Sequence, residues 1–356
     1  MTTISEKVSD KPTRTTRPVS TRVSQSVFDG SRLRVVLLVD VHDGAQQQFL
    51  EAYEQLCNQV AQVPGHVSDQ LCQSIENPSQ WLITSEWESA PPFLAWVNSE
   101  EHVEMVKPLH NCVRDTRSLR FHVVRETGGP SADAVRVLQA HPRMGDGVIR
   151  HALTFTVRPG SEAEVARILA DYASPQARVD DSTRLCRTSL FMHGNRVVRA
   201  IEVRGDLMAA LRHVARQPEV RAVEEAINPY LEQDRDLNDQ ESARVFFTRA
   251  ALPAVHHVSA AEPAEGERHA LCYPARPGCG MRLAELLAQQ DEAAAEDPAS
   301  PVLHSTVFQR DDVVVRLVEQ RPGTPVDVTP AHALTALLDG DAVRMQLLTD
   351  RRSPDA

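Results

Sequence analysis

The first third of the chain shows apolar patterns that change period at turn signals. Residues 34–41 are rich in β-branched side chains, which predicts a strand. Residues 45–63 then repeat apolar side chains at helical spacing, up to the Pro64-Gly65 stop. A hairpin over 67–75 and 80–88, a helical region over 91–109 and a strand over 118–124 follow. The order β-α-β-β-α-β is typical of a ferredoxin-like unit.

The middle of the chain shows the same order. Strands are predicted at 150–157, 184–192, 196–203 and 244–249, with helices at 161–172 and 206–231. Pro218 interrupts the second helical region, and we expect it to open a new helix. The matching break in the first unit lies at Asn98-Ser99, where Asn98 and Glu101 have capping-box spacing.

Direct repeats link the middle of the chain to its last third. HALTFTVRPG at 151–160 returns as HALCYPARPG at 269–278, and the hairpin at 190–205 returns 117 residues later. Such a period indicates three whole domains of one kind rather than a solenoid. We expect a disordered tail (1–30), then domains over 31–126, 148–258 and 267–350, the last of them degenerate. Linkers are expected at 128–147 and 253–267.

The predicted class is α+β, with three ferredoxin-like units forming pairs of the dimeric α/β-barrel type. Helices cover one face of such a sheet, and its other, apolar face has to be buried. Two units can pair face to face within the chain. The third unit then either finds another chain or stays capped, and a homodimer is predicted.

Composition and charge narrow the classes of protein. A net charge of −11 argues against nucleic-acid binding. No apolar run is long enough to span a membrane, and the N-terminus is not of the signal-peptide type. The six cysteines lack CxxC or zinc spacing, so reduced thiols in a cytoplasm are the simplest interpretation.

Longer motifs resemble known families. SEWES at 85–89 and FLAWVNSEEH at 93–102 resemble the antibiotic biosynthesis monooxygenase family. RHVARQPEVRAVEEAINPYLEQDRDL at 212–237 and ARVFFTRAALPAVHH at 243–257 resemble the SchA/CurD-like family of actinomycete aromatic polyketide and spore-pigment pathways. The resemblance covers about residues 34–258.

These resemblances imply oxygenation of a polycyclic aromatic polyketide, with molecular oxygen as co-substrate and no bound flavin or haem. The protein would supply a base, donors for an oxyanion and a dry pocket. A cyclase of the same fold and a non-catalytic polyketide-binding subunit are the alternatives. Other enzymes of the pathway are possible partners.

Residues special to one unit are the candidates for chemistry. Glutamates 86, 202 and 319 recur in all three units and are assigned to the scaffold, where each would pair with an arginine or cap a backbone edge. The base is sought among His66, His110 and His122, since imidazole titrates near neutral pH. Planar substrate would be positioned by Trp87 and Trp96, although both also suit a core. Asn98 is an oxyanion donor or a helix cap. Substrate contacts are assigned to Arg120, Arg199 and His213, and no metal site is predicted.

Overall fold

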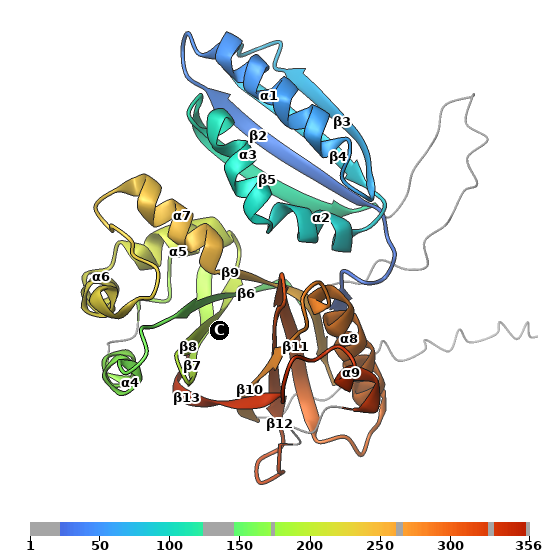
Figure 1. Ribbon diagram of the computed structural model, residues 1–356, viewed down its shortest axis with the longest axis vertical. Helices are drawn as coiled ribbons and strands as arrows, with labels where there is room; N and C mark the ends of the chain where they lie inside the picture. Colours follow the sequence, from blue (N-terminus) through green and yellow to red (C-terminus); the bar gives the residue numbers. More distant parts are fainter. Residues whose placement is uncertain (1–21, 124–145, 172–174, 261–265, 327–330, 354–356) are drawn as a thin grey trace, which may run out of the picture.

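The computed structural model describes residues 22–123, 146–171, 175–260, 266–326 and 331–353. The described part forms a four-stranded antiparallel sheet, a separate eight-stranded barrel, and the helices that cover them (Figure 1). Most of the predicted linker at 128–147 lies outside the described residues. No described helix is long and apolar enough to cross a membrane.

The first unit has the predicted order of elements. They are β2 (Leu33–Val41), α1 (Gln46–Val60), β3 (His66–Gln73), β4 (Gln80–Trp87), α2 (Ala90–Val97), α3 (Glu100–His110) and β5 (Val113–His122). The strand order is β3-β4-β2-β5. Alternate residues of β2, such as Val35 and Val39, are buried beneath the helices. Leu38 points to the opposite, open face, as does Phe121, which pairs with Arg34; both apolar side chains are exposed.

The second and third units follow the same order. The second contains β6 (Val148–Thr156), α4 (Glu162–Ala170), β7 (Arg184–His193), β8 (Arg196–Arg204), α5 (Leu207–Ala215), α6 (Pro218–Ile227), a 3-10 turn (Asn228–Tyr230), α7 (Gln240–Ala250) and β9 (Ala251–Ser259). The third contains β10 (Glu267–Pro274), α8 (Gly280–Glu296), β11 (Val302–Arg310), β12 (Val313–Gln320), α9 (His332–Thr335) and β13 (Val343–Arg352). Pro218 opens α6, as its missing N–H and fixed φ predict.

These two units close on each other as a barrel. The strand order is β9-β11-β12-β10-β13-β7-β8-β6, and β6 pairs again with β9. One end of the barrel interior is filled by apolar side chains, among them Phe191, Phe308, Val315 and Met345. The mixed α+β class and the eight-stranded barrel agree with the sequence-based prediction.

The predicted strand at 244–249 is wrong. Those residues belong to helix α7, and the strand is β9, which includes Pro253 from the predicted linker. A short apolar run such as Val245-Phe246-Phe247 fits a helix or a strand equally well. Phe246 is buried, and the Arg235 guanidinium lies 4.6 Å from its ring centroid. The helix α7 therefore packs through the face that carries Phe246.

Two further expectations need correction. The predicted disordered tail over 1–30 is wrong at its C-terminal end, because β1 (Ser24–Ser26) pairs with β9 and Arg22 makes ion pairs with Glu292 and Glu296 of α8. Residues 1–21 lie outside the described residues. The cap of α3 is Ser99, not Asn98: its hydroxyl accepts from the backbone N–H of His102 at 3.1 Å.

The first unit packs against the barrel. A single apolar core joins Trp87 and Phe93 to Tyr273 and Val314 of the third unit. Polar contacts add to this junction, where Arg310 Nε donates to the Asn98 carbonyl at 3.3 Å. The four-stranded sheet therefore uses its helical side for this contact and leaves its other face open.

Candidate functional site

An arginine–glutamate pair stands at the same place in every unit. Strand register sets Arg34 opposite Glu86, Arg150 opposite Glu202, and Arg268 opposite Glu319. Arg34 Nη2 lies 2.6 Å from Glu86, and Arg268 Nη2 lies 2.6 Å from Glu202 and 3.3 Å from Glu319. Each recurring glutamate thus pairs with arginine, as a scaffold role requires.

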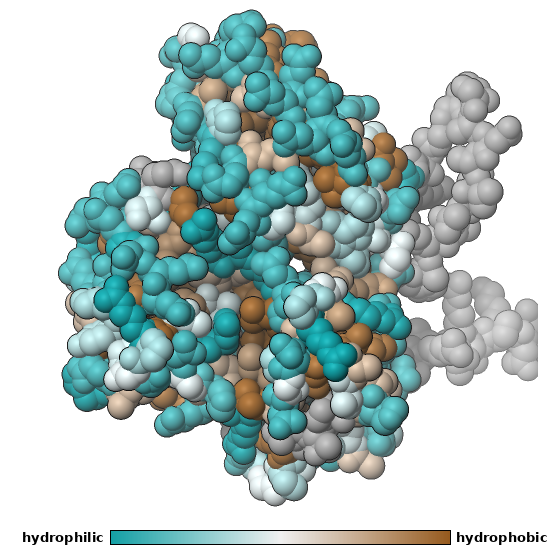
Figure 2. Space-filling view, viewed as in Figure 1, coloured by the Kyte–Doolittle hydropathy of each residue, from teal (hydrophilic) through white to brown (hydrophobic). Residues whose placement is uncertain are grey.

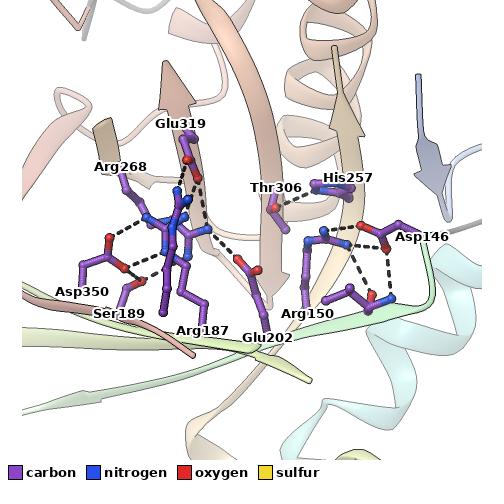
Figure 3. A network of polar contacts seen from close by, with 12 residues as sticks. Asp146, Arg150, Arg187, Ser189, Glu202, His257, Arg268, Thr306, Glu319 and Asp350 are labelled. Atoms are coloured by element: carbon purple, nitrogen blue, oxygen red, sulfur yellow. Dashed lines mark hydrogen bonds and ion pairs between the residues drawn. The ribbon is translucent and has the colours of Figure 1, made fainter. Parts of the chain in front are cut away.

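The barrel copies of this pair line a polar cavity of about 310 Å³. The cavity lies at the end of the barrel opposite the apolar plug, and its walls come from strands of both units (Figure 3). Its lining includes Arg150, Arg187 and His257 of the second unit and Arg268, His304 and Glu319 of the third unit. The cavity therefore exists only when the two units pack together.

One half of the cavity wall is ionic. Arg187 Nη1 lies 2.6 Å from Glu319, and Arg187 Nε donates to Asp350 at 2.8 Å. The Ser189 hydroxyl donates to the same Asp350 carboxylate at 2.8 Å. Burial opposes the charge of Asp350, but the hydrogen bond and attraction from Arg187 prevail and lower its pKa. These carboxylates therefore stay ionised and hold fixed positions.

The other half of the wall places two histidines where the first half has the ion pair. His304 lies 117 residues after Arg187, and Thr306 lies 117 after Ser189. Strand register pairs Thr306 with His257 as it pairs Ser189 with Asp350. The equivalent hydrogen bond also exists, with His257 Nδ1 3.0 Å from Thr306 Oγ1. The two imidazole rings are nearly parallel, with centroids 6.3 Å apart.

His257 is electrically neutral at neutral pH. Burial lowers its pKa well below the usual value, and Arg150 lowers it further, while Asp146 acts in the opposite direction. Nε2 of His257 is buried and has no hydrogen-bond partner among the described residues. In the tautomer whose Nδ1–H donates to Thr306, Nε2 carries the lone pair and can accept a proton from a bound molecule.

The cavity thus combines a neutral base with nearby fixed cations. A proton accepted by His257 leaves an anion that Arg150 and Arg268 can stabilise in a site of low dielectric. Across the described residues, no group of three or more His, Cys, Asp or Glu side chains could hold a metal ion. The geometry suits proton transfer from a weak acid.

The predicted unit-one residues gather into an aromatic cluster instead. Trp87 is 0% exposed, its Nε1 donates to Ser85 at 3.0 Å, and Trp96 stacks on it at 5.4 Å. His66 meets the Trp87 ring edge-on, and its Nε2 lies 2.8 Å from Asp69. Trp87 is thus enclosed by protein side chains in this structure, and its role in positioning substrate stays a prediction.

The other predicted bases lie apart from this cluster. His110 ends α3 and its Nδ1 is 2.8 Å from Arg244, while His122 on β5 is 4.0 Å from Asp29. Asn98 follows α2, and its side-chain amide nitrogen is buried without a partner among the described residues. The Arg120 guanidinium lies 5.3 Å from the ring centroid of Phe93. The structure does not bring the three histidines together.

Arg199 and His213 do not line the barrel cavity. Val198 faces the interior, so its neighbour Arg199 faces outward, where it pairs with Glu224 of α6 at 2.6 Å. His213 on α5 contacts the carbonyl of Gln176 at 3.2 Å. Alternation along β8 and the position of α5 place both residues outside the barrel cavity, and their assignment to substrate contact stays a prediction.

Sequence reasoning missed His257, His304 and the arginines at 150, 187 and 268. The signal was present in the repeat, because the 117-residue offset replaces Arg187 by His304. The importance of this replacement depends on the pairing of β9 with β11, which sets His257 beside Thr306. That pairing could not be predicted from the sequence.

Comparisons with known proteins agree with the two resemblances. A SchA/CurD-like domain model matches residues 148–260, and an antibiotic biosynthesis monooxygenase model matches residues 32–108. "Polyketide synthase CurD" of Streptomyces cyaneus is 68% identical over 87% of this chain and 84% of its own length. "Protein SchA" of Streptomyces halstedii is 58% identical over 94% of this chain and 97% of its own.

A solved structure of SnoaB, a cofactor-independent oxygenase from Streptomyces nogalater, covers 27% of this chain and 96% of its own, at 18% identity and a TM-score of 0.26. The whole-length relatives suffice: the chain belongs to the SchA/CurD-like family, with an antibiotic biosynthesis monooxygenase domain before its SchA/CurD-like domain.

Proposed function

We propose that the protein is a cofactor-independent oxygenase of aromatic polyketide biosynthesis and that its catalytic centre is the polar cavity of the barrel. The names of its relatives support the pathway, since one is called a polyketide synthase. The substrate class is a polycyclic phenol or anthrone, whose C–H or O–H is acidic enough for an imidazole base.

One observation carries the placement of the site. The barrel is built from two equivalent halves, and the halves differ where Arg187 and Asp350 are replaced by His304 and His257. The glutamates shared by the units, such as Glu319, serve the scaffold. The neutral histidine pair has no equivalent in the other half. His257 lines the cavity, and its buried Nε2 has no hydrogen-bond partner among the described residues.

The chemistry balances without an added reductant. His257 Nε2 takes a proton from the methylene carbon of an anthrone, and the resulting anion passes one electron to O2. The substrate radical and superoxide combine into a peroxide, which takes up a proton from the imidazolium. Loss of water then converts the original methylene into a quinone carbonyl, with one oxygen atom in the product and one in water.

Two other functions could use the same cavity, and one of them would also use the same base. A cyclase would use the anion of His257-assisted deprotonation to form a carbon–carbon bond without oxygen. A non-catalytic subunit would bind the polyketide and pass it to other enzymes of the pathway. Turnover of an anthrone under ¹⁸O₂ tests all three: label in the quinone supports the oxygenase, whereas unchanged turnover under argon or binding without product would replace it.

We propose further that the three units are copies of one ferredoxin-like fold and that the protein is a homodimer. Within the chain, two units cover each other's Arg–Glu faces. The same face of the first unit carries Arg34 and Glu86 beside the exposed Leu38 and Phe121. The same face of a second copy would cover it, because the second and third units already pack together through their corresponding faces.

A further inference from the structure

The barrel has two equivalent seams where its strands separate. β6 pairs with β9 over three residues, 151–153 with 253–251, and β10 pairs with β13 over three residues, 270–272 with 345–343. Beyond these short ladders the strands diverge, so each unit has a wedge between its first and last strands. The two wedges correspond, because Leu153 and Leu271 occupy the same place in the repeat and each pairs with the last strand of its unit.

The β6/β9 seam is closed by the chain itself. β1 runs along β9 beyond the short ladder, with Ser24 opposite Val258 and Ser26 opposite His256. The Ser24 hydroxyl bonds to Glu292, and Arg22 anchors the same segment to α8. A strand therefore fills the space that the divergence creates.

The β10/β13 seam holds no described strand and forms a hollow of about 600 Å³. Its walls include Arg268, His269, Arg344, Met345, Leu347 and Asp350. The Leu347 residue is 42% exposed, which is high for a large apolar residue on a strand. Only 22% of the Asp350 side chain is exposed, although the residue as a whole is exposed. The backbone of β13 is therefore open to solvent at this residue.

This hollow adjoins the polar cavity. Arg268 borders both spaces, and Asp350 at the hollow bonds to Arg187 of the cavity. A molecule whose acidic group lies near His257 could thus extend outward between β10 and β13. The closed seam on the other side offers no such path past β1.

We propose that the open β10/β13 seam binds the outer rings of the substrate, so that the protein selects planar molecules longer than the polar cavity; this rests on the proposed function. The exposed Leu347 gives the seam apolar surface for a ring system. The Arg344 guanidinium is held in place by His269, with 2.9 Å between Arg344 Nη2 and His269 Nδ1, and can contact a ring face or a peripheral hydroxyl.

Filling the seam tests the proposal with two probes of different length. Phenol has one ring, whereas 1,8-dihydroxyanthraquinone has three rings and, under this proposal, extends from the cavity into the seam. Leu347→Trp is expected to weaken binding of the anthraquinone at least 10-fold and to leave phenol within 2-fold, as measured by calorimetry on the full chain. Ile149→Trp is the matched control, since Ile149 is 40% exposed on β6 of the same barrel.

The outcomes separate this proposal from the proposed function. If His257→Gln weakens anthraquinone binding and Leu347→Trp does not, the cavity is right and the seam is wrong. If neither substitution changes binding, both are wrong. Equal weakening of phenol and anthraquinone by Leu347→Trp would also contradict selection by length. Leu347→Ser, which shortens the side chain, gives a second variant: it is expected to weaken the anthraquinone alone, by a few-fold.

Discussion

At the scale of single residues, the hydrogen bond from His257 to Thr306 sets the orientation of the proposed base. Thr306→Val removes the hydroxyl that holds Nδ1 at 3.0 Å. We expect kcat for anthrone oxidation to fall about 10- to 100-fold and its pH profile to shift, because the tautomer is no longer fixed. Ser189→Ala at the equivalent position should leave the pH profile in place, and equal shifts for both variants would count against the assignment.

Buried neutral histidines make stability depend on pH. Burial, aided by Arg120, lowers the pKa of His151 to about 4. The unfolded chain therefore binds a proton near pH 6.5 that the folded chain binds only near pH 4, so stability is full above pH 6.5 and is lost as the pH falls towards 4. His151 alone accounts for at most about 3 kcal/mol.

Urea unfolding at pH 7.5 and pH 5 checks this dependence. His151→Gln has no ionisable ring and should show a smaller loss of unfolding free energy between the two pH values than the unsubstituted chain. An identical loss in both proteins would show that His151 does not titrate as its burial requires.

The ionic half of the barrel predicts a large stability effect. Glu319 is buried and pairs with Arg187, Arg268 and Arg352. Glu319→Gln leaves three arginines short of a counter-charge and should lower the unfolding free energy by about 3–5 kcal/mol. Glu104→Gln, at an exposed pair with Lys107, is the control and should change it little. Comparable losses in the two variants would contradict a structural role for the network.

At the scale of elements, β1 acts as the closing strand of one seam. Deleting residues 1–21 removes no described contact, whereas deleting 1–27 removes β1 and its pairing with β9. Hydrogen exchange at Val258 and its neighbours should rise only in the longer deletion, together with a lower melting temperature. Unchanged protection in the longer deletion would mean that β9 does not depend on β1.

Most elements could be predicted because their patterns are local. Helix α1 has a 3.6-residue period and a Pro-Gly stop, and Pro218 marks the start of α6. Helix α7 could not be assigned, since three adjacent apolar residues define no period. The site was missed for a related reason: Arg187 and Asp350 are 163 residues apart, and only the closure of the barrel brings them together.

At the scale of the whole molecule, the open sheet face of the first unit predicts assembly. A second copy covering that face would bury Leu38 and Phe121, which are now exposed. Light scattering should give the mass of a dimer, and Leu38→Lys should give a monomer because a charge would be buried at the contact. Met208→Lys, on the exposed side of α5, is the control. A monomer before any substitution would contradict the assembly.

We expect the oxidation to occur in the barrel cavity rather than in the aromatic cluster of the first unit. The most direct measurement is kcat/KM for anthrone oxidation under ¹⁸O₂ by His257→Gln and by His66→Gln, side by side. We expect kcat/KM to fall at least 100-fold for His257→Gln, with labelled quinone still formed by His66→Gln at nearly the full rate. Full activity in His257→Gln together with loss in His66→Gln would contradict it.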